Sequence, residues 1–227
     1  MITVVNQPTY LPWIGYFAMM DRADNFVFYD DVQLSAQSWQ QRNKIKTSSG
    51  VQWLTIPIMR EIGQRICDVK INHSTDWPRK HWKTIEQAYS KTEFFKTYGP
   101  YIDELYRVNW YLLGDFTMYV AKILAMLLDI KMPTIYTSSA LFTEGTKTDR
   151  LISLLKNLKT TEYISGQAGR KYIEPEKFEE AGIKLTWFEY DHPVYPQIRG
   201  EFIPYLSALD LLMNTGDKAI EYVRGKV

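Results

Sequence analysis

The chain has 227 residues, of which 45% are hydrophobic and 23% charged, a balance typical of a folded globular protein rather than a disordered one. Its 27 basic and 26 acidic residues give a net charge of +1, which argues against an extensive nucleic-acid interface. Aromatic residues are the unusual feature, at 15% of the chain with 7 Trp and 16 Tyr. They suit a wet cleft for a ring-shaped ligand, and they equally suit an aromatic-rich core.

Cysteine usage and hydropathy indicate the compartment. The single cysteine, Cys67, cannot form a disulfide within the chain, which favours a reducing environment. No signal peptide precedes the strand-like run 2–5, and no apolar stretch reaches the roughly 20 residues that span a bilayer. We therefore expect a soluble, cytoplasmic protein without a membrane span.

Short apolar runs bounded by turn signals predict the strands. Five of them are expected at 2–5, 25–29, 134–137, 162–165 and 184–189. Two more runs, 51–58 and 66–71, predict a β hairpin around the loop 59–64.

Amphipathic or apolar segments between these runs predict helices. They are expected at 13–22, 76–89, from Pro100 onward, 109–129, 146–158, 207–214 and 217–225. Asp76 is predicted to cap the second helix, with Pro78 in its first turn. Thr146 or Thr148 caps a later one, and Ser207 with Asp210 is interpreted as an N-cap pair.

Strands separated by helical segments indicate an α/β fold with a mostly parallel, Rossmann-like sheet. The hairpin would be an insertion or an edge element, and residues 76–130 a helical insertion within one domain of residues 1–227. Ligands of such sheets bind beyond the carboxyl ends of the strands. The polar residues after each strand are therefore the candidates for a site.

The first candidate segment follows the first strand and reads Gln-Pro-Thr-Tyr-Leu-Pro-Trp-Ile-Gly-Tyr-Phe over residues 7–17. Two prolines make the turn rigid, a glycine permits close backbone approach, and the amides of the next helix can bind an anion. Its predicted ligand-binding residues are Gln7, Tyr10, Trp13, Gly15 and Tyr16. The alternative is an ordered strand-to-helix loop whose aromatics fill the core.

The second candidate segment follows the second strand. Asp30 and Asp31 can bind a sugar hydroxyl, hold a metal or act as a base. Basic side chains further on can clamp a phosphate, and the predicted binding residues are Gln33, Trp39, Arg42, Asn43 and Lys44. The alternative is a solvated charged loop. We expect the turn near Trp13 and the strand end at Asp30 to face a common hollow.

Histidine and small residues supply the remaining candidates. His192 is the predicted general base, against the alternative of a turn histidine held by a backbone bond. His81 fits ligand binding and packing equally well, and His73 is expected to be solvated. Substrate-binding roles are also predicted for Ser165, Gly166, Tyr195 and Gln197. The histidines and the cysteine are too scattered for a zinc site, so no metal is predicted.

The segment 7–17, together with Phe-Tyr-Asp-Asp-Val-Gln at 28–33 and Trp39 followed by Arg-Asn-Lys-Ile at 42–45, resembles the WbqC-like family. Tyr-Ile-Ser-Gly at 163–166, His-Pro-Val-Tyr-Pro-Gln at 192–197 and Leu-Ser-Ala-Leu-Asp-Leu at 206–211 extend the likeness over nearly the whole chain. The resemblance implies a bacterial role in O-antigen, lipopolysaccharide or related surface-glycan biosynthesis. It also implies a transferase that attaches an amino acid such as glycine to an amino sugar.

A more distant likeness joins the strand, proline-containing loop and helix start to the nucleotidyltransferase and pantothenate-synthetase superfamily. Enzymes of that superfamily hold ATP phosphates with a His-x-Gly-His turn. The corresponding stretch here is Trp13-Ile14-Gly15-Tyr16, which keeps the glycine and lacks both histidines. The likeness implies ATP with Mg as a cofactor, and the departure leaves Arg42, Lys44 or Lys80 to stabilise the phosphate charge.

Two functions remain open at this point. One is aminoacyl or acyl transfer to a nucleotide-linked amino sugar, with free amino acid and ATP, aminoacyl-tRNA or a thioester carrier as donor. The other is a non-catalytic nucleotide- or sugar-binding module of a glycan biosynthesis cluster.

Overall fold

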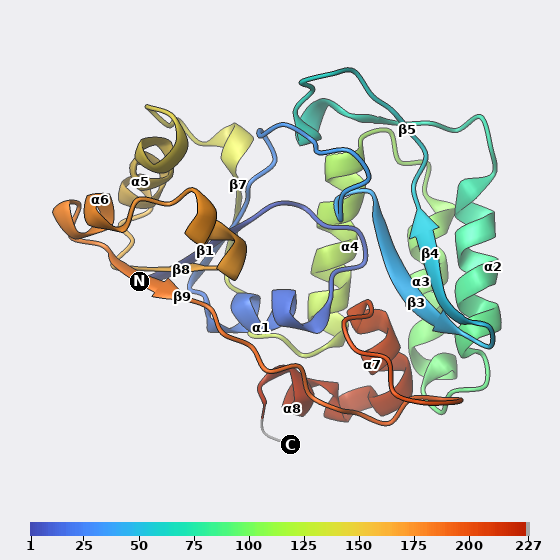
Figure 1. Cartoon of the computed structure of the whole chain (residues 1–227). Helices are drawn as coiled ribbons and strands as arrows, with labels where there is room; N and C mark the ends of the chain where they lie inside the picture. The colour runs from blue at the N-terminus through green and yellow to red at the C-terminus, as the bar shows by residue number, and fades with distance from the viewer. Residues whose placement is uncertain (226–227) are drawn as a thin grey trace.

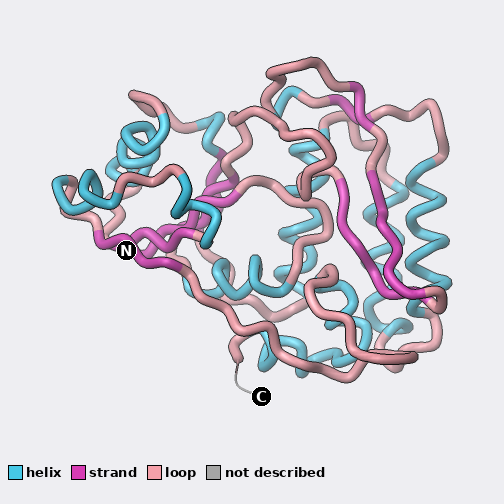
Figure 2. Tube along the Cα trace, viewed as in Figure 1, coloured by secondary structure: helices cyan, strands magenta, loops and turns pink. Residues whose placement is uncertain are grey.

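The computed structural model describes residues 1–225 and has a five-stranded parallel sheet at its centre (Figures 1 and 2). The strands are β1 (Ile2–Asn6), β2 (Asn25–Phe28), β7 (Thr134–Thr137), β8 (Glu162–Ser165) and β9 (Lys184–Trp187). Their order is β7-β2-β1-β8-β9, and every neighbouring pair is parallel. The predicted Rossmann-like α/β class is confirmed, and the chain reverses its direction of winding between β1 and β8.

Helices cover both faces of this sheet, because successive side chains of a strand point to opposite faces. Val4 of β1 joins the core on the side of α1 (Ile14–Arg22), whereas Val5 joins the core on the side of α5 (Lys147–Asn157) and α6 (Pro175–Glu180). Figure 1 shows α5 and α6 on one side of the strands and α1 on the other.

A long excursion separates the neighbouring strands β2 and β7. It contains a hairpin of β3 (Arg42–Thr47) and β4 (Gly50–Thr55), and a small pair of β5 (Ile58–Met59) and β6 (Lys70–Ile71). Three helices follow: α2 (Trp77–Tyr89), α3 (Phe95–Arg107) and α4 (Leu113–Leu127). In Figure 1 the β3–β4 hairpin lies on the opposite side of the molecule from the central sheet, next to α2 and α3.

The predicted hairpin of 51–58 with 66–71 is wrong in its pairing. Residues 50–55 pair with 42–47, while only Ile58–Met59 pairs with Lys70–Ile71 and Ile66–Asp68 forms a 3-10 turn. No strand was predicted at β3, where three of the six residues are cationic. Asn43 and Ile45 are nevertheless buried, so the strand hides its alternate residues and turns its cations to the other face.

Helix ends follow local capping chemistry in two cases. The Asp76 side chain accepts the Arg79 amide at 3.4 Å, and Ser207 caps α7 (Ala208–Thr215) by accepting the Leu209 amide at 3.2 Å, as predicted. Pro100 does not open a helix, because it lies inside α3. The predicted helix 217–225 is a 3-10 turn, Gly216–Lys218, followed by the short α8 (Ala219–Val223).

None of the helices within residues 1–225 is long and apolar enough to cross a membrane.

Candidate functional site

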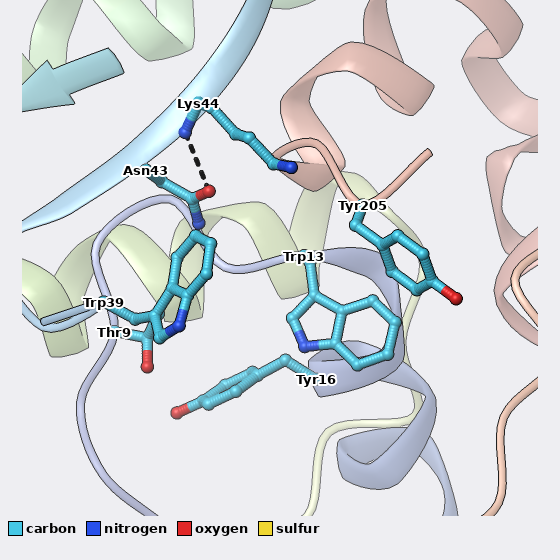
Figure 3. A pocket seen from close by; sticks show the side chains of 7 residues that line it. All are labelled: Thr9, Trp13, Tyr16, Trp39, Asn43, Lys44 and Tyr205. Carbon is cyan, nitrogen blue, oxygen red and sulfur yellow. Dashed lines mark hydrogen bonds between the residues drawn. The ribbon is translucent and has the colours of Figure 1, made fainter. Parts of the chain in front are cut away.

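A cavity of about 360 Å³ lies where the loop after β1, the strand β3 and the segment before α7 meet (Figure 3). Its walls are Thr9, Trp13, Tyr16, Trp39, Asn43, Lys44 and Tyr205. Four of these residues are aromatic and one is cationic, the composition of a site for a flat or ring-shaped anion. Other hollows run along α5 and between α2 and α3.

Trp13 forms its wall of the cavity because Gly15 has no side chain. A Cβ built on Gly15 would lie 2.2 to 2.7 Å from ring atoms of the Trp13 indole, which is far inside van der Waals contact. The indole therefore folds back over the first turn of α1. The close approach that this glycine permits is to the protein's own side chain.

Asn43 holds the turn that precedes Trp13. Its Nδ2 donates to the carbonyl oxygens of Tyr10 (3.1 Å) and Leu11 (2.7 Å), and its Oδ1 accepts the Lys44 amide at 2.8 Å. Leu11 has a φ of 45°, a left-handed conformation that a bulky residue rarely adopts without such support. Asn43 is 1% exposed, so these bonds are shielded from water and rigidify the cavity floor.

Backbone hydrogen bonds join the segment before α7 to the strand β3 and to the loop after β1. The Ser207 amide donates to the Lys44 carbonyl at 3.0 Å, and the Ala208 amide donates to the Pro12 carbonyl at 2.8 Å. Three segments that are far apart in sequence thus meet at fixed spacing. The cavity is a product of tertiary structure rather than of one motif.

Lys44 supplies the positive charge of the cavity. Among the residues that the structure describes, no carboxylate lies within 4.0 Å of its ammonium group, and the side chain reaches over the aromatic walls in Figure 3. A cation without a carboxylate partner beside apolar rings favours an incoming anion, because the charge is screened less there than in open water.

His192 contacts two walls of the cavity, Trp13 and Tyr205, and does not line the cavity itself. Its Nε2 accepts the Tyr205 amide at 3.1 Å, and its Nδ1 is 2.9 Å from the Pro193 carbonyl, to which it donates in the same tautomer. Its ring stacks on the Trp13 indole at 6.3 Å between centroids and meets the Tyr205 ring at 4.8 Å. Burial lowers the pKa of His192. Both nitrogens are engaged, as in the turn-histidine alternative.

A buried polar network holds the long segment 188–207 against β3. Lys46, which is 5% exposed, donates through Nζ to the Gln197 side chain (3.1 Å) and to the Glu201 carbonyl (2.6 Å). Asp210 accepts from the hydroxyls of Tyr89 (2.8 Å) and Tyr195 (3.0 Å). Burial raises the pKa of Asp210 to about 6. Asp210, interpreted from the sequence as part of an N-cap, is therefore the centre of this network.

Asp30 and Asp31 do not line the cavity, so the expected common hollow with Trp13 is not formed by these two carboxylates. Asp30 is 2% exposed and accepts the Ser139 amide (2.9 Å) and hydroxyl (2.7 Å). Asp31 pairs with Arg150. The physical reason is the neighbouring strand β7, because the turn that follows it presents serine donors to the carboxylates at the end of β2.

Tyr10 is also outside the cavity, because it is fully buried. Its hydroxyl lies 2.9 Å from His81 Nδ1 and 2.5 Å from the Tyr106 hydroxyl. Burial lowers the pKa of His81 to about 4, which keeps the imidazole neutral at physiological pH. His81 is thus a packing residue in this structure, joining α2 to the turn after β1.

The other predicted residues lie around the cavity or away from it. The Gln7 side chain forms a hydrogen bond with the Gln40 side chain. Gln33 is exposed, and its backbone pairs with that of Arg65 in an isolated antiparallel β-bridge. Ser165 is buried against Gly169, while the space beyond Gly166 is open. Of the predicted site residues, Trp13, Tyr16, Trp39, Asn43 and Lys44 come together in the cavity walls.

Sequence reasoning missed Thr9 and Tyr205, which line the cavity. Thr9 lay within the motif 7–17 that was singled out. Tyr205 carried no such signal. Its position depends on the bond to His192, thirteen residues earlier, and on a left-handed φ of 56°.

The residues present do not fit ATP at the turn that replaces His-x-Gly-His. The Trp13 indole covers the backbone at Gly15, where a phosphate would have to approach. Within residues 1–225 there is also no group of three or more His, Cys, Asp or Glu side chains that could hold a metal ion.

The fold and the cavity together define a Rossmann-like α/β protein with an aromatic, cation-bearing pocket beside the end of its first strand. The chain matches the WbqC-like protein family over residues 7–222 and belongs to that family. It is similar to the uncharacterized protein Rv1507c of Mycobacterium tuberculosis (strain ATCC 25618 / H37Rv), with 35% identity over 222 residues, 96% of this chain and 95% of the relative. No solved structure matches the chain significantly. The nucleotidyltransferase likeness stays a hypothesis.

Proposed function

We propose that this protein binds a nucleotide-linked amino sugar and catalyses amide formation on its amino group, in O-antigen or related surface-glycan biosynthesis. Family membership supports the glycan context. The acyl group is an amino acid such as glycine, delivered from an activated donor. In this reaction the amine nitrogen forms a bond to the acyl carbon, the donor's leaving group departs, and the amine loses a proton.

The observation that carries the proposal is the pairing of aromatic walls with the uncompensated Lys44. Aromatic faces pack against the apolar faces of sugar rings, and Tyr and Trp also offer a polar tip. An ammonium without a carboxylate partner suits a phosphate group. A sugar attached to a diphosphate presents these two features side by side, as the walls and Lys44 do.

The cavity suits orientation of the sugar more than proton transfer. For His192 to accept the amine proton, its Nε2 would have to release the Tyr205 amide. The carboxylates of Asp30 and Asp31 are engaged by Ser139 and Arg150. We therefore assign Trp13, Tyr205 and Lys44 to binding, and propose that an amine held in the cavity loses its proton to water or to the donor.

The composition of the walls favours a second candidate, a non-catalytic binding module. The described residues that line the cavity include neither a carboxylate nor an imidazole, the side chains that most often transfer protons. Such a module would bind the same sugar nucleotide and present it to another enzyme.

One assay separates the two functions. Purified protein is incubated with a nucleotide-linked amino sugar and, in parallel, with glycine plus ATP, glycyl-tRNA or a glycyl thioester, and the products are analysed by mass spectrometry. A product heavier by one amino-acid residue, formed by the native chain and lost in Lys44→Met, supports the enzyme. Tight binding of the sugar nucleotide without product from any donor supports the module instead.

A further inference from the structure

An exposed aromatic surface adjoins the cavity and is not explained by packing. Trp39 is 50% exposed and Trp53 43% exposed, and their ring centroids are 5.3 Å apart. The Arg42 guanidinium lies 4.4 Å from the centroid of a Trp53 ring. Isolated exposed hydrophobic residues are common, but two tryptophans in contact with each other and with an arginine form a stacking surface. We name these three residues the tryptophan platform.

The platform lies on the same face of the β3–β4 hairpin as Lys44, one of the walls of the cavity. Arg42 and Lys44 are two residues apart on β3, so their side chains point to the same side. Trp53 lies directly opposite Lys44 in the antiparallel register. Trp39 belongs to both surfaces, since it also forms a wall of the cavity. A ligand can therefore run from the cavity past Lys44 onto the platform without leaving the protein surface.

The size of the cavity favours such an extension. At about 360 Å³ it lies at the lower end of the range for small-molecule sites, enough for a single ring with its substituents. A nucleotide-linked sugar has a second ring system, the nucleobase, at the far end of the diphosphate. If the sugar occupies the cavity, then the base must lie outside it.

We propose that the tryptophan platform is the nucleobase subsite of a sugar nucleotide whose sugar lies in the cavity and whose diphosphate lies at Lys44; this rests on the proposed function. Stacking on tryptophan is open to every base, because each has a flat π face. Arg42 backs Trp53 and adds positive charge beside the diphosphate. The subsite therefore selects a nucleoside diphosphate as a class.

The test measures affinity by calorimetry for three probes: a panel of nucleoside diphosphates, the corresponding sugar nucleotides, and a sugar 1-phosphate without a base. The native chain is compared with Trp53→Ala and with Tyr111→Ala, a control that removes a 60% exposed aromatic residue outside the cavity walls and the platform. Trp53→Ala is expected to weaken binding of the nucleoside diphosphates and sugar nucleotides about tenfold. It should leave sugar 1-phosphate binding within twofold, and the control should leave all three unchanged.

Each of the following results overturns the proposal. Equal affinity of the native chain and Trp53→Ala for sugar nucleotides would remove the platform from the site while the proposed function stands. An equal loss for sugar 1-phosphate would place the sugar, and not the base, on the platform. If the native chain binds neither sugar 1-phosphate nor sugar nucleotides, then the proposed function fails with it. A change in self-association of Trp53→Ala without any change in affinity would make the platform a protein contact.

Discussion

Single side chains decide the shape of the cavity, and Trp13 is the clearest case. Its indole lies where a Cβ of residue 15 would have to be, so the wall exists only because that residue is glycine. The roles of two histidines are likewise decided by the side chains and backbone groups around them. His192 was expected to be a base and is bonded through both nitrogens, while His81 is buried in a tyrosine network.

Gly15→Ala is expected to displace the Trp13 indole. Overpacking at such a contact costs about 1–3 kcal/mol of the free energy of unfolding, and affinity for the sugar nucleotide should fall at least about tenfold. The control is Gly166→Ala, because a Cβ there meets nothing within 4 Å. Urea unfolding and calorimetry of both variants provide the measurement. Native-like affinity in Gly15→Ala would show that the indole is not a wall of the ligand site.

His192→Gln tests positioning against catalysis. Glutamine can accept the Tyr205 amide as the imidazole does, so the amide-forming rate is expected to stay within about threefold of the native rate. His192→Ala should bind the sugar nucleotide more weakly, because the Tyr205 amide loses its acceptor and the Tyr205 ring is no longer held in place. The rates and binding constants of both variants are compared. A rate reduced about 100-fold or more in His192→Gln with unchanged binding would instead identify a general base.

The lowered pKa of His81 predicts that the free energy of unfolding falls in acid. Burial lowers its pKa to about 4 in the folded chain, against about 6.5 when unfolded. The unfolded chain therefore binds more protons between these values, and stability falls as the pH drops through this window. From pH 7 to 4.5 the contribution is about 2 kcal/mol. Urea unfolding should show this loss reduced in His81→Gln; the same pH dependence in both proteins would contradict the assignment.

At the scale of elements, the site depends on two segments that carry little regular hydrophobic pattern. The strand β3 presents Arg42, Lys44 and Lys46 on one face, and the segment 188–207 crosses it with almost no secondary structure of its own. Long loops without internal structure are usually functional. Here the loop is held by the buried ammonium of Lys46, which binds the Glu201 carbonyl, and by the carboxylate of Asp210, which accepts the Tyr195 hydroxyl.

Lys46→Met is expected to loosen this segment. It leaves the Glu201 carbonyl without the Lys46 donor and leaves the Gln197 Oε1 with the Ile203 amide alone, which costs about 2–4 kcal/mol of unfolding free energy. Hydrogen exchange of residues 188–207 should accelerate, and ligand affinity should fall with it. Lys184→Met is the control, since that side chain is 69% exposed and its ion pair is worth little. Unchanged exchange in Lys46→Met would show that other contacts hold the segment.

At the scale of the whole molecule, the parallel sheet could be predicted and the site only in part. Apolar runs such as Ile2–Asn6 and Asn25–Phe28 carry their own strand signal, and alternation with helices indicates parallel pairing. The cationic strand β3 was missed because Ile45 is its one apolar residue, so it has no apolar run that would predict a strand. Tyr205 could not be predicted, since tertiary contacts alone bring it to Trp13. Asp30 was misplaced because the serines after β7 that satisfy it lie more than a hundred residues away.

The most direct test of the whole account is a crystal structure with a nucleotide-linked amino sugar. The sugar ring is expected between Trp13, Tyr16 and Tyr205, with a phosphate oxygen within hydrogen-bond distance of Lys44 Nζ. Ligand density confined to another hollow of the protein, with the space between these rings empty, would contradict it.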